Sequence, residues 1–238
     1  MELRQIPIFD DTQCEQIGAQ VHRLRHYWIP RREPPCFFFT LGPASYLDCS
    51  GTDGTAYEAS AEEQNEVLLN AFSEMYQRVL DRLGCELRAP VVLWKKFAIP
   101  GFHIWLTRGI CTTPVASIHF DLQYVHLKLN GSDSPRSDQV LSFTLPIKLP
   151  RAGGGLNVWD LDYQEYQEAR ARGFVESINE IKRFKTMSFL RYEVGTLVLH
   201  SGHMLHQIAP TSKLEQNDER VTLQGHGLFL EGAWHLYW

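Results

Sequence analysis

Long apolar runs are absent from the sequence. No stretch of its 238 residues approaches the roughly 20 apolar residues that cross a bilayer, and its first residues lack the basic-then-apolar order of a secretory signal. Cysteine is also scarce: the chain has five, an odd number, with no C-x-x-C pair. This argues against a disulfide framework or a thiolate metal site and favours reduced thiols, so we expect a cytoplasmic protein.

An excess of positive charge is absent as well. The chain has 23 Lys and Arg residues against 28 Asp and Glu residues, a net charge of −5, which gives no electrostatic reason to expect nucleic acid or an anionic membrane as a partner. Apolar residues make up 44% of the chain and charged residues 21%. That composition excludes disorder, coiled coil and collagen, and the length fits one domain.

The first part of the chain, residues 1–89, has mainly helical patterning. One helix is predicted after Asp10, with apolar residues at steps of three and four. A second is predicted over 61–83 and ended by Gly84. Between them, the aromatic segment 37–42 favours a strand. These helices are expected to buttress a sheet.

From residue 90 onward the pattern indicates short strands separated by turn residues. A helical insertion is predicted over 161–184, and the glycines at 153–155 predict a hairpin turn because no helix follows them. Strands at this spacing favour a sandwich or barrel, hence a β-rich α+β domain over 90–238. The expected strands cover 91–98, 102–106, 116–129, 140–149, 156–159, 187–192, 196–200 and 220–230.

The most informative short pattern is His119-Phe120-Asp121. In a strand, residues two apart project to the same face, so this imidazole and this carboxylate should converge. Imidazole and carboxylate together suit a borderline divalent metal, but two ligands leave the site incomplete. A third should come from a distant strand, where His200, His203 and His206 are the candidates. Two histidines and one carboxylate would form the facial triad of non-heme Fe(II) enzymes.

An arginine follows these histidines at the start of a strand-like stretch. Arg220 suits a co-substrate carboxylate, because a guanidinium binds carboxylates through two parallel hydrogen bonds. A keto acid that chelates iron at one end leaves its far carboxylate in need of such a partner. Arg220 is therefore the candidate for that role.

Four stretches in this order resemble the Fe(II)/2-oxoglutarate-dependent oxygenases, with a layout similar to prolyl hydroxylases: His119-Phe120-Asp121, the Gly-Gly-Gly-Leu of 153–156, the His-Gln-Ile-Ala-Pro of 206–210, and Glu219-Arg220. The resemblance covers roughly 90–230 and implies a double-stranded β-helix, a jelly-roll or cupin-like core. It also implies that His119, Asp121 and His206 bind iron and that Arg220 holds 2-oxoglutarate.

The same resemblance sets the expected activity. It implies a dioxygenase that uses dioxygen to hydroxylate an unactivated C–H bond and releases succinate and carbon dioxide. Retention of Asp121 favours hydroxylation, desaturation or cyclisation over halogenation. The compact, acidic domain favours a small-molecule substrate, such as an amino acid or a natural-product intermediate, while a peptidyl substrate stays open. The alternatives are a cupin-like metalloenzyme that does not use 2-oxoglutarate, and a non-catalytic β-sandwich interaction module.

Five further residues are candidates for substrate contact. Gln123 has the same strand parity as the H-x-D pair, and Gln224 and His226 alternate with Arg220 along its strand. His103 and Trp105 lie on an upstream strand where related enzymes build a substrate wall. Each is also compatible with a purely structural role in the core.

Overall fold

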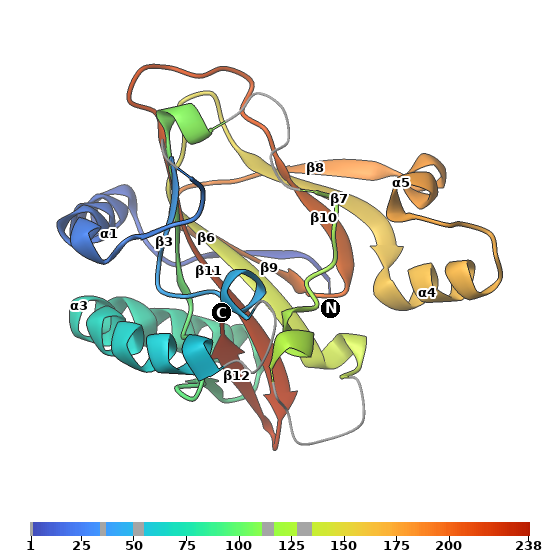
Figure 1. The fold of residues 1–238 in the computed structure, drawn as a ribbon, viewed down its shortest axis with the longest axis horizontal. Coiled ribbons are helices and arrows are strands. Elements are labelled where there is room, and N and C mark those ends of the chain that lie inside the picture. Colours follow the sequence, from blue (N-terminus) through green and yellow to red (C-terminus); the bar gives the residue numbers. More distant parts are fainter. Residues whose placement is uncertain (1, 34–36, 50–54, 111–116, 128–134) are drawn as a thin grey trace.

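Two largely antiparallel sheets face each other in the computed structural model, which describes residues 2–33, 37–49, 55–110, 117–127 and 135–238 (Figure 1). The larger sheet has nine strands and the smaller has three. In order, the main path of the larger sheet is β1 (Arg4–Pro7), β9 (Thr196–Ser201), β6 (Val140–Lys148), β11 (Glu219–Leu230), β5 (Gly101–Leu106), β3 (Phe38–Leu41) and β2 (Ile29–Pro30).

Two more strands extend the larger sheet beside β11. β12 (Ala233–Tyr237) pairs with β11, and β4 (Val91–Leu93) pairs with β12 in parallel. The smaller sheet has the order β10 (Met204–Ala209), β7 (Gly155–Asp162) and β8 (Met187–Arg191). The predicted β-rich α+β, jelly-roll architecture is confirmed.

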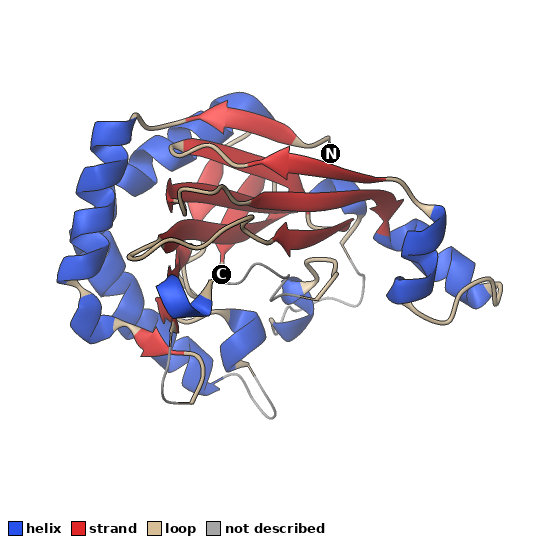
Figure 2. Cartoon of the chain, turned by 90° about the horizontal axis from the view of Figure 1, so that it is seen from above, coloured by secondary structure: helices blue, strands red, loops and turns tan. Residues whose placement is uncertain are grey.

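Helices cover the outer face of the larger sheet (Figure 2). α1 (Asp11–Arg23) begins with a capping box, in which the Asp10 side chain accepts from the Gln13 backbone N–H and the Gln13 side chain reaches back. α3 (Thr55–Leu87) buries the predicted apolar face. It continues past Gly84, contrary to the prediction, because glycine inside a helix costs only about 1 kcal/mol. It ends instead before Arg88, which has a left-handed φ of 52°.

The alternation of side chains along the central strands separates an apolar core from a polar interior. Residues of β5, β6, β9 and β11 that face the helices are buried and apolar, such as Ile104, Leu145, Leu199 and Leu223. Their neighbours on the opposite face include seven buried polar residues: His103, Ser142, Thr144, His200, Arg220, Thr222 and His226. This face of the larger sheet therefore supplies a cluster of polar side chains to the space between the two sheets.

Several predicted strands differ from the observed ones. The strand expected over 91–98 is only Val91–Leu93. The strand expected over 116–129 is wrong for its described part: His119 forms an isolated bridge and Gln123–His126 is a 3-10 turn; residues 116, 128 and 129 lie outside the described residues. The first 89 residues are not only helical, because they also supply β1, β2 and β3.

Within the range 161–184 of the predicted helical insertion lie α4 (Tyr163–Ala171) and α5 (Ile178–Ile181), between β7 and β8, while residues 161 and 162 belong to β7. A four-residue helix, α2 (Ser45–Asp48), precedes α3. Gly153, with a φ of 97°, and Gly154 lie in the connection before β7, which begins at Gly155. This connection is not a hairpin, however, because β6 and β7 belong to different sheets.

Among the described cysteines, Cys14, Cys49 and Cys85 are free thiols, while Cys36 and Cys111 lie outside the described residues. No helix in the described part of the chain has the length and apolar character to cross a membrane.

Candidate metal centre

The two histidines of the predicted triad are direct partners in an antiparallel bridge. The backbone N–H of His119 donates to the His206 carbonyl at 3.0 Å, and the His206 N–H donates to the His119 carbonyl at 3.0 Å. Residues paired in this way carry their side chains on the same face, and the two imidazole rings lie 4.5 Å apart between centroids. The strand β10 therefore places His206 beside a residue that is far from it in sequence.

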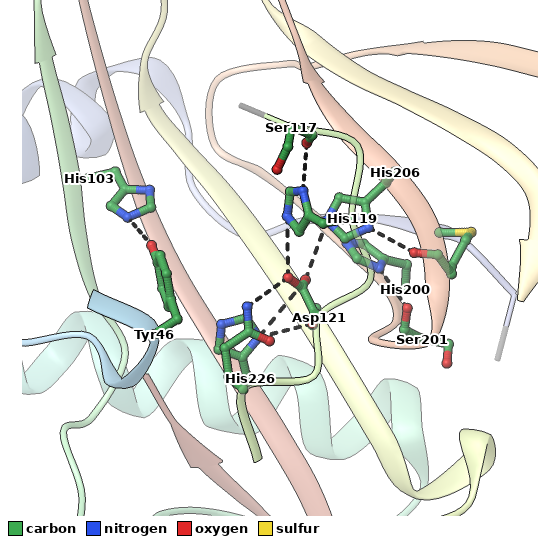
Figure 3. Close-up of polar contacts among 12 residues, drawn as sticks. Tyr46, His103, Ser117, His119, Asp121, His200, Ser201, His206 and His226 are labelled. Carbon is green, nitrogen blue, oxygen red and sulfur yellow. Dashed lines mark hydrogen bonds and ion pairs between the residues drawn. The ribbon is translucent and has the colours of Figure 1, made fainter. Parts of the chain in front are cut away.

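Asp121 completes this cluster from the same segment as His119. Its backbone N–H donates to the Gly202 carbonyl at 2.7 Å, which fixes the segment next to the β9–β10 turn. One carboxylate oxygen lies 3.6 Å from Nε2 of His119 and the other 3.4 Å from Nε2 of His206. One ligand atom from each of the three residues falls within 4.8 Å of the others, so the cluster could hold a metal ion (Figure 3).

Backbone contacts fix which nitrogen of each histidine faces the cluster. Nδ1 of His119 lies 2.8 Å from the Ser117 carbonyl, and Nδ1 of His206 lies 2.8 Å from the Met204 carbonyl. A carbonyl oxygen only accepts, so each Nδ1 carries the proton and each Nε2 keeps its lone pair. Both lone pairs therefore belong to the nitrogens next to Asp121, as a metal site requires.

Burial shapes the protonation of the centre. Burial lowers the pKa of His206 to about 3, against the opposing effect of Asp121. For Asp121, burial alone would raise the pKa of the carboxyl, but the imidazoles of His206, His226 and His119 hold it below its usual range. Neutral imidazole and ionised carboxylate are the forms that bind a divalent metal.

The other two candidate histidines lie differently. The His200 ring is 4.7 Å from that of His206, and its Nδ1 lies 2.8 Å from the Ser201 carbonyl. His203 points elsewhere, because its Nε2 contacts the Tyr124 hydroxyl at 3.0 Å. Of the three, only His206 joins the cluster of possible ligands among the described residues.

A cavity of about 300 Å³ opens in front of the triad, between the two sheets. All five residues predicted to contact substrate line it: His103, Trp105, Gln123, Gln224 and His226. Gln123 reaches Asp121 from the 3-10 turn rather than by strand alternation, and its Nε2 donates to a carboxylate oxygen at 2.9 Å. His226 approaches the other oxygen at 4.0 Å while its Nδ1 contacts Ser142 Oγ at 3.0 Å.

Arg220 lies beside this cavity, in the core of the protein. It is paired in register with Trp105 on β5, and its guanidinium carbon sits 5.5 Å from the centre of the Tyr192 ring. Its Nη2 is buried without a hydrogen-bond partner, and burial lowers the pKa of the group. A smaller hollow of about 20 Å³ reaches Arg220 and shares Trp105 and Ile208 with the main cavity. An unneutralised cation at this place fits the far carboxylate of a keto acid.

The cavity also contains residues that no sequence pattern singled out. Tyr46, on α2, contacts Nε2 of His103 through its hydroxyl at 2.5 Å, and this pair lies apart from the triad (Figure 3). Burial raises the pKa of Tyr46 and lowers that of His103 to about 3. Arg32 lines the cavity as well. Neither residue lies in a periodic or motif-bearing stretch, so only the fold reveals them.

Several solved structures with a similar fold bind or depend on 2-oxoglutarate, also called alpha-ketoglutarate. An N-substituted L-amino acid dioxygenase from Burkholderia ambifaria, in complex with alpha-ketoglutarate, matches with a TM-score of 0.61 and 14% identity over 99% of this chain and 86% of that chain. The alpha-ketoglutarate-dependent epimerase SnoN of nogalamycin biosynthesis matches with a TM-score of 0.53 and 10% identity over 95% and 79%.

HygX from Streptomyces hygroscopicus, with nickel and 2-oxoglutarate bound, matches with a TM-score of 0.50 and 15% identity over 95% of this chain and 82% of that chain. No family model matches this chain, and no curated protein matches it in sequence. At these identities the likeness is one of fold. It agrees with the fold that the four sequence stretches implied.

Proposed function

We propose that this protein is an Fe(II)/2-oxoglutarate-dependent dioxygenase that hydroxylates an unactivated C–H bond of a small molecule, an amino acid or a natural-product intermediate. The observation that carries the proposal is the convergence of His119, Asp121 and His206, with both Nε2 lone pairs directed at the carboxylate side. Two neutral imidazoles and one carboxylate are the facial triad of non-heme Fe(II) oxygenases.

The donor set and its surroundings fit both the metal and the co-substrate. His119, Asp121 and His206 would hold Fe(II), and Arg220 would hold the far carboxylate of 2-oxoglutarate. When bound, these groups supply dioxygen activation: 2-oxoglutarate is oxidised to succinate and carbon dioxide, and one oxygen atom enters the substrate C–H bond. The unpartnered Nη2 of Arg220 supports this assignment, because a buried cation is costly without an anion.

The protein's own residues would orient the centre and keep it dry. The carbonyls of Ser117 and Met204 hold the two imidazole rings, and Gln123 holds the carboxylate of Asp121. Such outer contacts fix ligand geometry and typically change metal affinity or activity 10–100-fold when they are removed. Trp105 and Leu156 form part of the apolar wall of the cavity. That wall limits water at the reacting carbon.

The size of the cavity supports a small substrate. A volume of about 300 Å³ lies at the lower end of the range typical for small-molecule sites, roughly 300–1,000 Å³. The co-substrate would occupy part of that volume. A substrate no larger than an amino acid or a modest natural-product intermediate fits what is left.

The test is an anaerobic titration of the metal-free protein with Fe(II) and then with 2-oxoglutarate. A weak visible charge-transfer band that needs both additions, followed by succinate formation when dioxygen is admitted, would support the proposal. Asp121→Ala should bind no iron and give no band. Iron binding without a 2-oxoglutarate band would favour the cupin-like alternative, and no iron binding would favour the interaction module.

A further inference from the structure

Arg32 is a cation at the cavity that the proposed centre does not use. Of the described residues that line the cavity, it is the only Lys or Arg, and Asp121 is the only carboxylate. Arg32 is exposed, at the end of the short β2–β3 pairing. Its guanidinium carbon lies 5.5 Å from the centre of the Trp105 ring, which stacks in turn on Phe38 with centroids 3.9 Å apart.

The neighbouring arginine shows what a structural role in this segment looks like. Arg31 donates to both carboxylate oxygens of Asp48, at 2.5 and 2.8 Å, and to the Thr40 hydroxyl at 2.8 Å. Arg31 is therefore neutralised and ties the segment to α2 and β3. Within the described part of the chain Arg32 has no ion pair, not even with the adjacent Glu33. Its charge remains available to a ligand.

The balance of charges in the cavity indicates that this ligand carries an anionic group. The proposed centre contains two cations, Fe(II) with charge +2 and the buried Arg220 with charge +1. Its anions are Asp121 with charge −1 and 2-oxoglutarate with charge −2, so the loaded centre is neutral. Arg32 then adds one uncompensated positive charge to the cavity. A guanidinium held against an aromatic ring is pre-organised for a carboxylate or a phosphate, because its planar N–H groups match two anionic oxygens.

We propose that the substrate is a small organic oxyanion, a carboxylate or a phosphate ester, whose anionic group binds Arg32 while its apolar body lies along Trp105 and Phe38 toward the metal centre. This inference rests on the proposed function and adds the substrate class. The apolar body follows from the wall beside Arg32: Phe38, Trp105, Leu156 and Ile208 all line the cavity. The substrate is thus anchored by charge at one end and offers a C–H bond to the triad.

The experiment titrates the anaerobic Fe(II)–2-oxoglutarate holoenzyme with matched probes. The panel contains amino acids with apolar side chains, free and N-acetylated, the corresponding amides, and phosphate monoesters of apolar alcohols with the parent alcohols. Binding is followed by the change in the charge-transfer band and by calorimetry. At least one acid or phosphate ester should bind, and its neutral partner should bind at least about 10-fold more weakly, since a charge-assisted hydrogen bond is lost. The acid and phosphate series tell the two oxyanions apart.

Variants of Arg32 assign this preference to the residue. Arg32→Gln should weaken the anionic probe about 10-fold, leave the neutral partner unchanged and leave 2-oxoglutarate affinity unchanged. Arg32→Lys should retain part of the preference. Arg25→Gln is the matched control, because Arg25 is also exposed and its guanidinium carbon lies 5.4 Å over a tryptophan, Trp28, outside the cavity. It should behave as the wild type.

Several outcomes would overturn the inference. Equal binding of acids and neutral partners, binding of no oxyanion, or unchanged oxyanion binding in Arg32→Gln would each remove Arg32 from substrate recognition. A weaker 2-oxoglutarate affinity in Arg32→Gln would assign the residue to the co-substrate instead. Absence of the charge-transfer band would mean that the proposed function fails. Calorimetry of the same probes with the protein would then still decide whether Arg32 binds an oxyanion.

Discussion

Replacing Arg220 by methionine tests whether this residue binds the co-substrate or forms a structural ion pair. Methionine retains much of the side-chain length and removes the charge. If Arg220 were half of a buried salt bridge, its loss would destabilise the fold by about 3–5 kcal/mol, because the partner charge would be left unpaired. No acidic partner lies against Arg220 in the described part of the chain, and Nη2 is without a hydrogen bond.

In the metal-free protein, two smaller effects of Arg220→Met on the free energy of unfolding oppose each other. Removing a buried, unsatisfied N–H group relieves a cost of about 1–3 kcal/mol. Losing the contact with the Tyr192 ring, 5.5 Å from the guanidinium carbon, costs about 0.5–2 kcal/mol. We therefore expect metal-free Arg220→Met to lose no more than about 1 kcal/mol of its free energy of unfolding, and it can gain stability because a buried, unpaired charge is removed.

The effect on 2-oxoglutarate binding should be much larger. With anaerobic Fe(II) and 2-oxoglutarate at about 100 times its dissociation constant, the wild type should gain about 2.7 kcal/mol, or roughly 5–10 °C in Tm. If the variant binds 100-fold more weakly, the same concentration gives about 0.4 kcal/mol and a shift near 1 °C. Arg220→Lys, which keeps the charge without the planar fork, should fall between them.

Thermal unfolding of the three proteins, with and without 2-oxoglutarate at fixed Fe(II), measures both quantities. A 2-oxoglutarate-induced shift in Arg220→Met equal to that of the wild type would remove Arg220 from the co-substrate site. A loss of 3 kcal/mol or more in the metal-free variant, on the scale of a broken buried ion pair, would show that the guanidinium has a structural partner.

Three further predictions concern the triad, the packing and the pH dependence. His206→Ala should lose stoichiometric Fe(II) with an unchanged circular dichroism spectrum, while His200→Ala, in the same cavity, should keep it; the reverse result would reassign the ligand. Gly101→Ala should lower the free energy of unfolding in urea by about 2–3 kcal/mol, because a Cβ there would lie 2.3 Å from the Trp238 ring and 2.7 Å from the Leu41 carbonyl. Gly18→Ala, whose Cβ would meet only a methyl at 3.8 Å, should instead be neutral or stabilising, and equal losses in both would contradict the packing argument. Burial, reinforced by nearby arginines, lowers the pKa of His103 to about 3, so the unfolded state binds its proton first and stability falls as the pH drops below about 6.5. Between pH 6.5 and 4.5 the metal-free wild type should lose about 2–3 kcal/mol more than His103→Gln, and parallel urea curves would refute this.

Patterns that depend on local periodicity were predicted best from the sequence. The stripe of α3 and the long strand β11 follow from repeating apolar positions, which reflect burial directly. The segment around His119 is among the short strands predicted between turn residues. In the structure it makes one bridge and then a 3-10 turn. A strand forms only where a partner backbone is available, and no local pattern contains that information.

The difference between local patterns and contacts between distant segments also explains why the site could be predicted only in part. Residue chemistry alone could nominate His119 and Asp121, since their spacing is local, and also Arg220. The resemblance in the order of motifs then singled out His206 among the three candidate histidines. The bridge between His119 and His206 joins parts of the chain 87 residues apart in numbering, so its geometry could not follow from spacing.

Tyr46 and Arg32 lie outside every local pattern, because what gives them a chemical role is the cavity itself. α2 brings the Tyr46 hydroxyl to Nε2 of His103, and the β2–β3 pairing brings Arg32 over Trp105. Only a few residue types can serve as metal ligands in such a centre. The wall that contacts the substrate can instead be formed by almost any polar or aromatic residue that the fold places there. The chemistry of the site is therefore visible in the sequence before its specificity, and the specificity is the part that requires the three-dimensional arrangement.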